Sequence, residues 1–235
     1  MLGAITAMAQ TGCSQSPIHF VLPELRDRSG QIERIAVVTV GVSVRREGIY
    51  DFPPEWAEAA RTNLSNAIAK SFGRDTRFAI TELDPNEAQV ARQELERARE
   101  RMAAVRPRRI EARDCLAGPA PVLANAAGTD SLLLVYAKDS IGSASSRLTN
   151  LGAATMVAPI ILWGTMVYGP EIFSDDPDQR VSNMNAIALC LVDARQGDIL
   201  WFDLRFLNRG NLLDASDVDR RIGAAYAEFR EATQR

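Results

Sequence analysis

Two apolar runs joined by a short polar turn form the clearest pattern in the chain, within Ala186–Arg205. The runs are Ile187–Val192 and Ile199–Phe206, and both consist largely of aliphatic and aromatic residues. Such runs on either side of a short glycine-containing loop predict a β-hairpin. We expect a positive φ at Gly197, with a bulge beside it, because a side chain would clash in that turn.

Three earlier runs are predicted to be strands of the same sheet. Ile32–Val44 is apolar at consecutive positions, which is typical of a strand covered on both faces rather than an edge strand. Gly41 interrupts this run and predicts a bulge. Thr76–Leu83 and Ser131–Ala137 are the other two runs, so the sequence predicts about five strands in all.

Helical periodicity fills the intervals between the strands. Pro53 and Pro54 open a helix over Phe52–Phe72, because proline is favoured in a first helical turn. Asp84-Pro85 starts a second helix, which runs to about residue 105, and a short alanine-rich helix follows at Pro119–Ala127. Ser216 is expected to cap the last helix, whose buried stripe is Val218, Ile222, Ala225 and Phe229.

These elements predict an α/β fold, with a mixed sheet flanked by helices and ending in a hairpin and a C-terminal helix. At 235 residues, 46% hydrophobic and 24% charged, the chain fits one globular domain over residues 31–235, with a helical insertion at 85–105. An apolar segment at 150–168 includes Leu151–Tyr168, which has no charge, and Pro159 argues against a stable single span. We interpret it as a buried layer over the sheet. The alternatives are a surface segment that contacts lipid or another subunit, and a segment that inserts into a membrane only in an oligomer.

Charge and residue usage favour no catalytic function. The net charge of −3 does not favour nucleic-acid binding, and His19 is the one histidine that a Ser-His-Asp or Cys-His site would need. The chain has none of the common nucleotide-binding or redox motifs and no spacing typical of a metal site. We therefore expect no enzyme activity, cofactor or metal.

A carboxylate-based hydrolase is kept as an alternative. It would use Asp193 with Asp203, or Asp139. Against it, Asp193 lies where an aspartate bonds its own backbone in a turn, and Asp203 is expected on a solvent-facing side of its strand.

The N-terminus resembles a bacterial lipoprotein signal peptide. The first twelve residues carry no charge and are small or apolar, and they lead to Gly12-Cys13-Ser14. Residues 1–13 are therefore interpreted as a signal-like segment whose Cys13 becomes lipidated, and residues 14–30 as a tether. Cleavage after Ala7-Met8-Ala9, giving a soluble periplasmic protein, and a cytoplasmic chain are the alternatives.

The hairpin also resembles one found in a broad group of bacterial envelope lipoproteins. The residues that carry the resemblance are Leu191-Val192-Asp193-Ala194 and Gly197–Phe202, which includes Trp201, and Gly128-Thr129-Asp130 before a buried strand also matches. The resemblance is closest to uncharacterised proteobacterial lipoproteins. It extends distantly to the curli-secretion lipoprotein and to the amino-terminal domain of the Tol-system propeller protein. It implies a mixed α/β sandwich without catalytic residues, in which Asp193, Gly197 and Trp201 are structural.

Together these features predict a non-enzymatic lipoprotein, anchored in the outer membrane through Cys13 and facing the periplasm. Its expected partners are the lipid bilayer and either further copies of itself or other envelope proteins. A subunit of an oligomeric secretion or pore complex is the alternative. With Cys13 acylated, Cys115 and Cys190 remain as candidates for a disulfide, and a buried thiol at Cys190 is equally consistent with its place in a strand.

Overall fold

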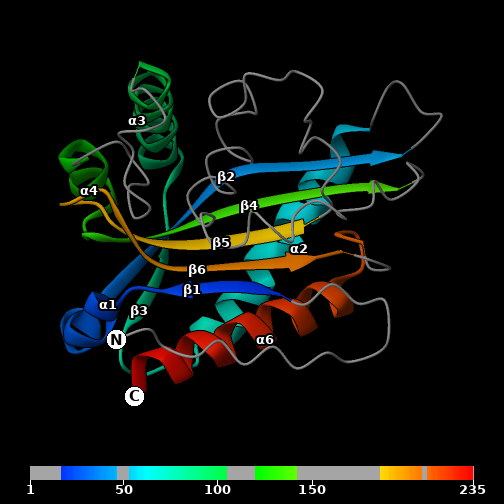
Figure 1. The fold of residues 1–235 in the computed structure, drawn as a ribbon. Coiled ribbons are helices and arrows are strands. Elements are labelled where there is room, and N and C mark those ends of the chain that lie inside the picture. The colour runs from blue at the N-terminus through cyan, green and yellow to red at the C-terminus, as the bar shows by residue number, and fades with distance from the viewer. Residues whose placement is uncertain (1–16, 47–52, 105–119, 142–185, 208–210, 235) are drawn as a thin grey trace.

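A six-stranded sheet forms the centre of the computed structural model, which describes residues 17–46, 53–104, 120–141, 186–207 and 211–234 (Figure 1). The strands lie in the order β1-β6-β5-β4-β2-β3. Their bounds are β1 Ile18–Val21, β2 Arg34–Arg46, β3 Ala79–Glu82, β4 Ser131–Ile141, β5 Ala186–Asp193 and β6 Asp198–Phe206. The helices are α1 Pro23–Arg28, α2 Pro54–Phe72, α3 Pro85–Ala104, α4 Pro121–Ala127 and α6 Ala215–Gln234, and a 3-10 turn, Ser29–Gln31, follows α1.

The mixed sheet predicted from the sequence is confirmed. The strand β2 runs parallel to both β3 and β4, whereas β4, β5, β6 and β1 pair antiparallel with one another. The described sheet has six strands rather than about five, because β1 adds an edge strand beside β6.

Most of the segment expected as a tether, residues 14–30, is structured instead, because residues 17–30 contain β1, α1 and the start of the 3-10 turn. In β1, Ile18 lies opposite Leu204 and Val21 lies opposite Trp201. The Leu22 amide continues this attachment by donating to the Leu200 carbonyl oxygen at 3.0 Å. Leu25 of α1 is fully buried, so this segment is part of the domain.

Burial of β2 on both faces confirms that it is not an edge strand. Ile35 and Val37 join the core under α2 and α6, and Ala36 and Val38 join the core on the opposite face. The expected irregularity at Gly41 is also present, since the register with β4 shifts between Thr39 and Gly41.

Helices lie on both faces of the sheet (Figure 1). The helices α2 and α6 lie against each other on one face, and α3 and α4 contact the other face near one end of the sheet. The predicted stripe of α6 is confirmed, because all four of its residues are buried. The stripe of α2 is likewise buried at Ala60, Leu64, Ala67, Ile68 and Phe72.

The hairpin between β5 and β6 is confirmed together with its local geometry. Gly197 has a φ of 81°, and the register of the two strands shifts between Leu191 and Val192. All eight residues of β5 are buried, which makes the hairpin the central element of the sheet rather than a surface feature.

The cap of α6 differs from the prediction. Asp214, not Ser216, is the capping residue, because its Oδ1 accepts the amide protons of Ser216 at 2.9 Å and Asp217 at 3.3 Å. The Ser216 hydroxyl also donates to this oxygen. These hydrogen bonds, led by the one from the Ser216 side chain, hold the pKa of Asp214 below its usual value.

Three expectations from the sequence fall on residues outside the described ranges. These are lipidation at Cys13, the position of the apolar segment 150–168, and the half of the candidate disulfide contributed by Cys115. None of the helices within the described ranges is long and apolar enough to cross a membrane.

Replacement of Gly197 by alanine should lower the free energy of unfolding by roughly 1–2 kcal/mol, because an L side chain is disfavoured at positive φ. Gly30→Ala is the matched control, because a Cβ at Gly30 meets no atom within 4 Å, and it should change the free energy by less than about 0.5 kcal/mol. Urea denaturation measures both, and equal effects would contradict the role assigned to the Gly197 turn.

Truncation of Trp201 to alanine should cost about 3–5 kcal/mol of unfolding free energy, as for other buried aromatic side chains. Trp201 is fully buried, and its ring lies 5.3 Å from that of Phe229 on α6. Trp201→Phe is the control, since it retains a ring and removes an indole N–H that has no hydrogen-bond partner within the described structure. Thermal and chemical denaturation should show a clearly smaller loss for Trp201→Phe than for Trp201→Ala.

Candidate functional site

Asp193 joins the hairpin turn to the N-terminal helix α1. Its Oδ1 accepts the backbone N–H of Arg195 at 2.8 Å, which confirms the expected turn around its own backbone. The guanidinium of Arg28 on α1 forms an ion pair with Oδ2 of the same carboxylate. Because the side chain of Asp193 is buried, these contacts satisfy a charge that would otherwise be costly to keep from water.

The hairpin turn is also fixed to the segment that leads into β4. The Ala194 amide donates to the Asp130 carbonyl oxygen at 2.8 Å, and the Ala194 carbonyl oxygen accepts from the Ala120 amide at 2.8 Å. Gly128 ends α4 with a φ of 62°, a left-handed conformation that glycine adopts without strain. The Thr129 hydroxyl then donates to the Arg34 carbonyl oxygen at 2.8 Å. The two motifs quoted for the family resemblance therefore meet at one end of the sheet.

Asp203 is placed differently from the prediction. It is fully buried beneath α6 instead of facing solvent. Arg205, two residues along β6, donates to both of its oxygens, from Nε at 2.6 Å and from Nη2 at 2.8 Å. Both faces of β6 are covered, so a polar residue in this strand has no solvent-facing side and needs an internal partner.

Four side chains from three elements meet around this ion pair, and we call them the edge cluster: His19 on β1, Asp203 and Arg205 on β6, and Glu228 on α6. The Arg205 guanidinium lies 2.9 Å from Glu228 Oε1. His19 is the register partner of Asp203, and its Nδ1 lies 3.4 Å from Glu228 Oε2. The edge cluster therefore links the edge strand β1 to both β6 and α6.

Burial dominates the electrostatics of the edge cluster. Removal from water raises the pKa of Asp203 to about 6, and the nearby Glu228 charge acts in the same direction. Hydrogen bonds and the positive charge of Arg205 act in the opposite direction. The result is a carboxyl group whose ionisation is more difficult in the folded protein than in the unfolded chain.

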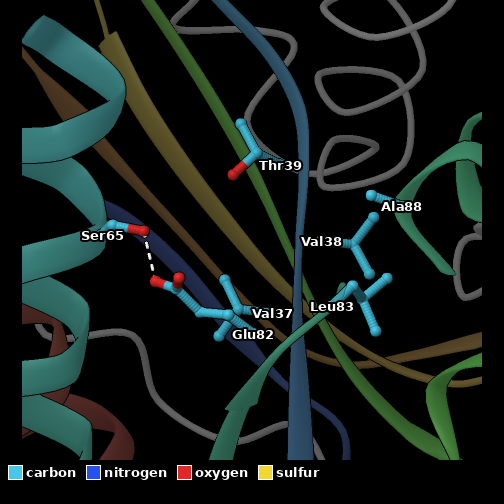
Figure 2. Close-up of a pocket in the computed structure, with 7 residues that line it drawn as sticks. All are labelled: Val37, Val38, Thr39, Ser65, Glu82, Leu83 and Ala88. Atoms are coloured by element: carbon cyan, nitrogen blue, oxygen red, sulfur yellow. Dashed lines mark hydrogen bonds between the residues drawn. The ribbon is translucent and has the colours of Figure 1, made fainter. Parts of the chain in front are cut away.

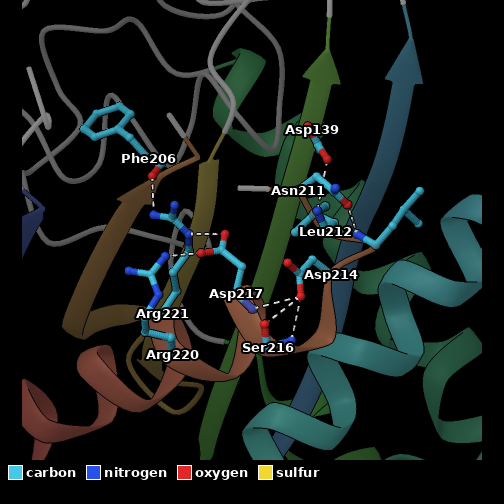
Figure 3. A network of polar contacts seen from close by, with 10 residues as sticks. Asp139, Phe206, Asn211, Leu212, Asp214, Ser216, Asp217, Arg220 and Arg221 are labelled. Carbon is cyan, nitrogen blue, oxygen red and sulfur yellow. Dashed lines mark hydrogen bonds and ion pairs between the residues drawn. The ribbon is translucent and has the colours of Figure 1, made fainter. Parts of the chain in front are cut away.

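A second polar network fixes the start of α6 to the rest of the domain (Figure 3). Asp139 at the end of β4 is almost fully buried, and its Oδ2 accepts the Leu212 amide at 3.0 Å. The Asn63 side chain on α2 donates to the Leu212 carbonyl oxygen at 2.9 Å. Further along α6, Arg221 donates to Asp217 at 2.8 Å and to the Phe206 carbonyl oxygen at 2.5 Å.

The three carboxylates of the hydrolase alternative are not brought together. Asp203 lies opposite Leu189, four positions along β5 from Asp193, which is about 13 Å of strand. Asp139 follows Lys138, which pairs with Ala186 at the far end of β5 from Asp193. The pairing of Asp193 with Asp203 as one catalytic site is therefore wrong.

One small cavity, of about 180 Å³, lies where β3 ends beside β2 (Figure 2). The Ser65 hydroxyl donates to the Glu82 carboxylate across it, so these two polar groups engage each other. Its lining residues are Val37, Val38, Thr39, Ser65, Glu82, Leu83 and Ala88. In the part of the chain that the structure describes, no three His, Cys, Asp or Glu side chains are grouped to hold a metal ion.

The remaining site residues predicted from the sequence are separate from these networks. Cys190 is fully buried in β5, opposite Leu134 and Phe202. Its disulfide with Cys115 stays a prediction, as does lipidation of Cys13. The edge cluster was not predicted from the sequence. The available signal was the spacing of two residues between Asp203 and Arg205, which places two opposite charges on one face of a strand.

Comparisons with known proteins give no family assignment. No protein-family model matches the chain, and no curated protein matches it significantly. Among solved structures, it is similar to a dodecamer of a PelC variant from Paraburkholderia phytofirmans, with 10% sequence identity and a TM-score of 0.30 over 93% of this chain and 97% of that chain.

Replacement of Asp203 by asparagine should change how stability depends on pH. Because the pKa of Asp203 is about 6 when folded and near 4 when unfolded, the contribution of Asp203 to stability falls as pH rises from about 4 through 6. The variant has no ionisable group at this position. The free energy of unfolding of the wild type, relative to that of Asp203→Asn, should therefore fall by on the order of 2 kcal/mol across that range. Chemical denaturation between pH 4 and 7 measures the difference, and a constant difference would contradict the assigned pKa.

Proposed function

We propose that this chain is a non-enzymatic lipoprotein of the cell envelope, anchored in the outer membrane through acylated Cys13 and facing the periplasm. The observation that carries the proposal is the sequence of the first twelve residues, which has no charged side chain and, apart from Gln10, consists of small or apolar residues, and which leads to Gly12-Cys13-Ser14. Triacylation of Cys13 would give a stable anchor, because a single acyl chain binds membranes only marginally.

The position of β1 supports an anchor at Cys13. Only Ser14, Gln15 and Ser16 separate Cys13 from Pro17, where the described domain begins. A strand of four residues is too short to be stable alone. An anchor joined to β1 can therefore hold the domain close to a membrane only if other contacts fix β1 to the domain. Pairing with β6, burial of Leu25 and the edge cluster supply that attachment.

A role in assembly rather than catalysis is the second part of the proposal. The described polar residues that sequence reasoning considered for chemistry are engaged in structural contacts: Asp193 with Arg28, Asp203 with Arg205, and Asp139 with the Leu212 amide. The resemblance of the hairpin to those of envelope lipoproteins points to a protein that acts by association. Its partners would be other envelope proteins or further copies of the chain.

The intact mass of the protein from its native host, together with membrane fractionation, tests the anchor. We expect a chain that begins at Cys13 and carries the mass of a diacylglyceryl group plus one acyl group, and that fractionates with the outer membrane. Cys13→Ala should lose both the added mass and the membrane association. Cys115→Ala is the matched control and should keep both, and an unmodified wild-type chain would refute the proposal.

A further inference from the structure

The register of the sheet places several strand termini at one end, which we call the anchor end. Ile18 at the start of β1 lies opposite Leu204, near the end of β6. Phe206 at the end of β6 lies opposite Ala186 at the start of β5, and Ala186 lies opposite Lys138, near the end of β4. The end of β2 continues this row, and Figure 1 shows the arrowheads of β2, β4 and β6 on the same side of the molecule.

The start of α6 belongs to the anchor end as well. Leu212, three residues before Ala215, bonds to Asp139 near the end of β4. The opposite end of the sheet, which we call the hairpin end, holds the turn with the exposed residue Gln196. The eight residues of β5 span about 24 Å between the two ends, at the usual rise of a strand.

Covalent geometry limits the distance between the anchor end and the proposed lipid anchor. Four residue steps separate Cys13 from Pro17, and a fully extended chain spans at most about 14 Å over four steps. Since β1 begins at Ile18 and is fixed to β6, the start of β1 lies within reach of the lipid, and the neighbouring strand termini follow from it at the usual spacing of about 5 Å per strand.

The connection between β4 and β5 also begins and ends at the anchor end, and contact with lipid is one of the alternatives for its uncharged part. The chain between β4 and β5, residues 142–185, leaves the sheet at Ile141 and returns at Ala186, and both positions belong to the anchor end. This part of the sequence includes Leu151–Tyr168, which has no charged residue. An uncharged sequence of this length is thus joined to the domain at the end that the anchor would hold near the bilayer.

We infer that the anchor end is the membrane-contacting surface of the domain and that the hairpin end is directed away from the bilayer into the periplasm. This inference rests on the proposed function, because it requires acylated Cys13. It adds an orientation, which acylation alone does not determine: a domain on the same anchor could also lie with its sheet flat along the membrane.

Resonance energy transfer to a membrane dye tests the orientation. The acylated full-length protein, with Cys115 replaced by alanine, receives a donor dye at Ala215→Cys or at Gln196→Cys. Both positions are exposed, one at each end of the sheet. Each protein is reconstituted in vesicles of phosphatidylethanolamine and phosphatidylglycerol that contain an acceptor-labelled lipid. The Cys115→Ala protein without an introduced cysteine is the labelling control, because any dye that it takes up is bound to the buried Cys190.

Transfer from position 215 should exceed transfer from position 196 at least about twofold, because about 24 Å of strand separates the two ends. Equal transfer would indicate a flat domain, and greater transfer from position 196 would indicate the reverse orientation; either result overturns the inference. The intact mass of each sample, measured before reconstitution, separates these outcomes from failure of the anchor. An unacylated chain refutes the proposed function and the inference together, whereas an acylated chain without the difference refutes only the orientation.

Discussion

Burial of the two strands of the central hairpin is the constraint on which the rest of the fold depends. Every residue of β5 is buried, and β6 is nearly so, which means that both faces of the sheet must be covered. On one face, α2 and α6 supply a continuous apolar layer, and aromatic contacts join Trp201 and Phe72 to Phe229. Because the area kept from water dominates the favourable free energy of folding, the hairpin requires elements packed against both of its faces.

The covered strands of the hairpin leave no solvent-facing position for a charge, and this explains the ion pairs of Asp203 and Asp193. Asp203 within β6 needs Arg205, and Asp193 at the turn needs Arg28. Burying such charges costs desolvation free energy, which the Coulomb attraction offsets only with good geometry. What these ion pairs provide is a connection between elements far apart in sequence: Asp193 is fixed to α1, and Arg205 connects Asp203 to Glu228 of α6.

The sequence contained strong signals for the hairpin and weak ones for its partners. The turn at Gly197 was predictable because two apolar runs flanked a glycine, and the bulge at Gly41 because a glycine broke an apolar strand. The strand β1 was missed because four residues in a polar segment carry little periodicity. The environment of Asp203 was misjudged because alternation was expected in a strand that has no polar face. The cap of α6 is Asp214 rather than Ser216; both residue types cap helices well, and the hydrogen bonds of the structure distinguish them.

The edge strand β1 has one role in the fold and a second in the proposed anchoring. As an element of the fold, β1 covers the outer edge of β6 and continues through Leu22 into α1. As the first described segment after Cys13, it is also the part of the domain to which a lipid anchor would be joined. A long flexible tether would leave the domain free to rotate over the membrane, whereas an anchor only a few residues from a strand that is fixed to β6 would restrict that rotation. On the proposed function, the contacts of the four residues of β1 are therefore what would let an acyl group orient the protein as well as retain it.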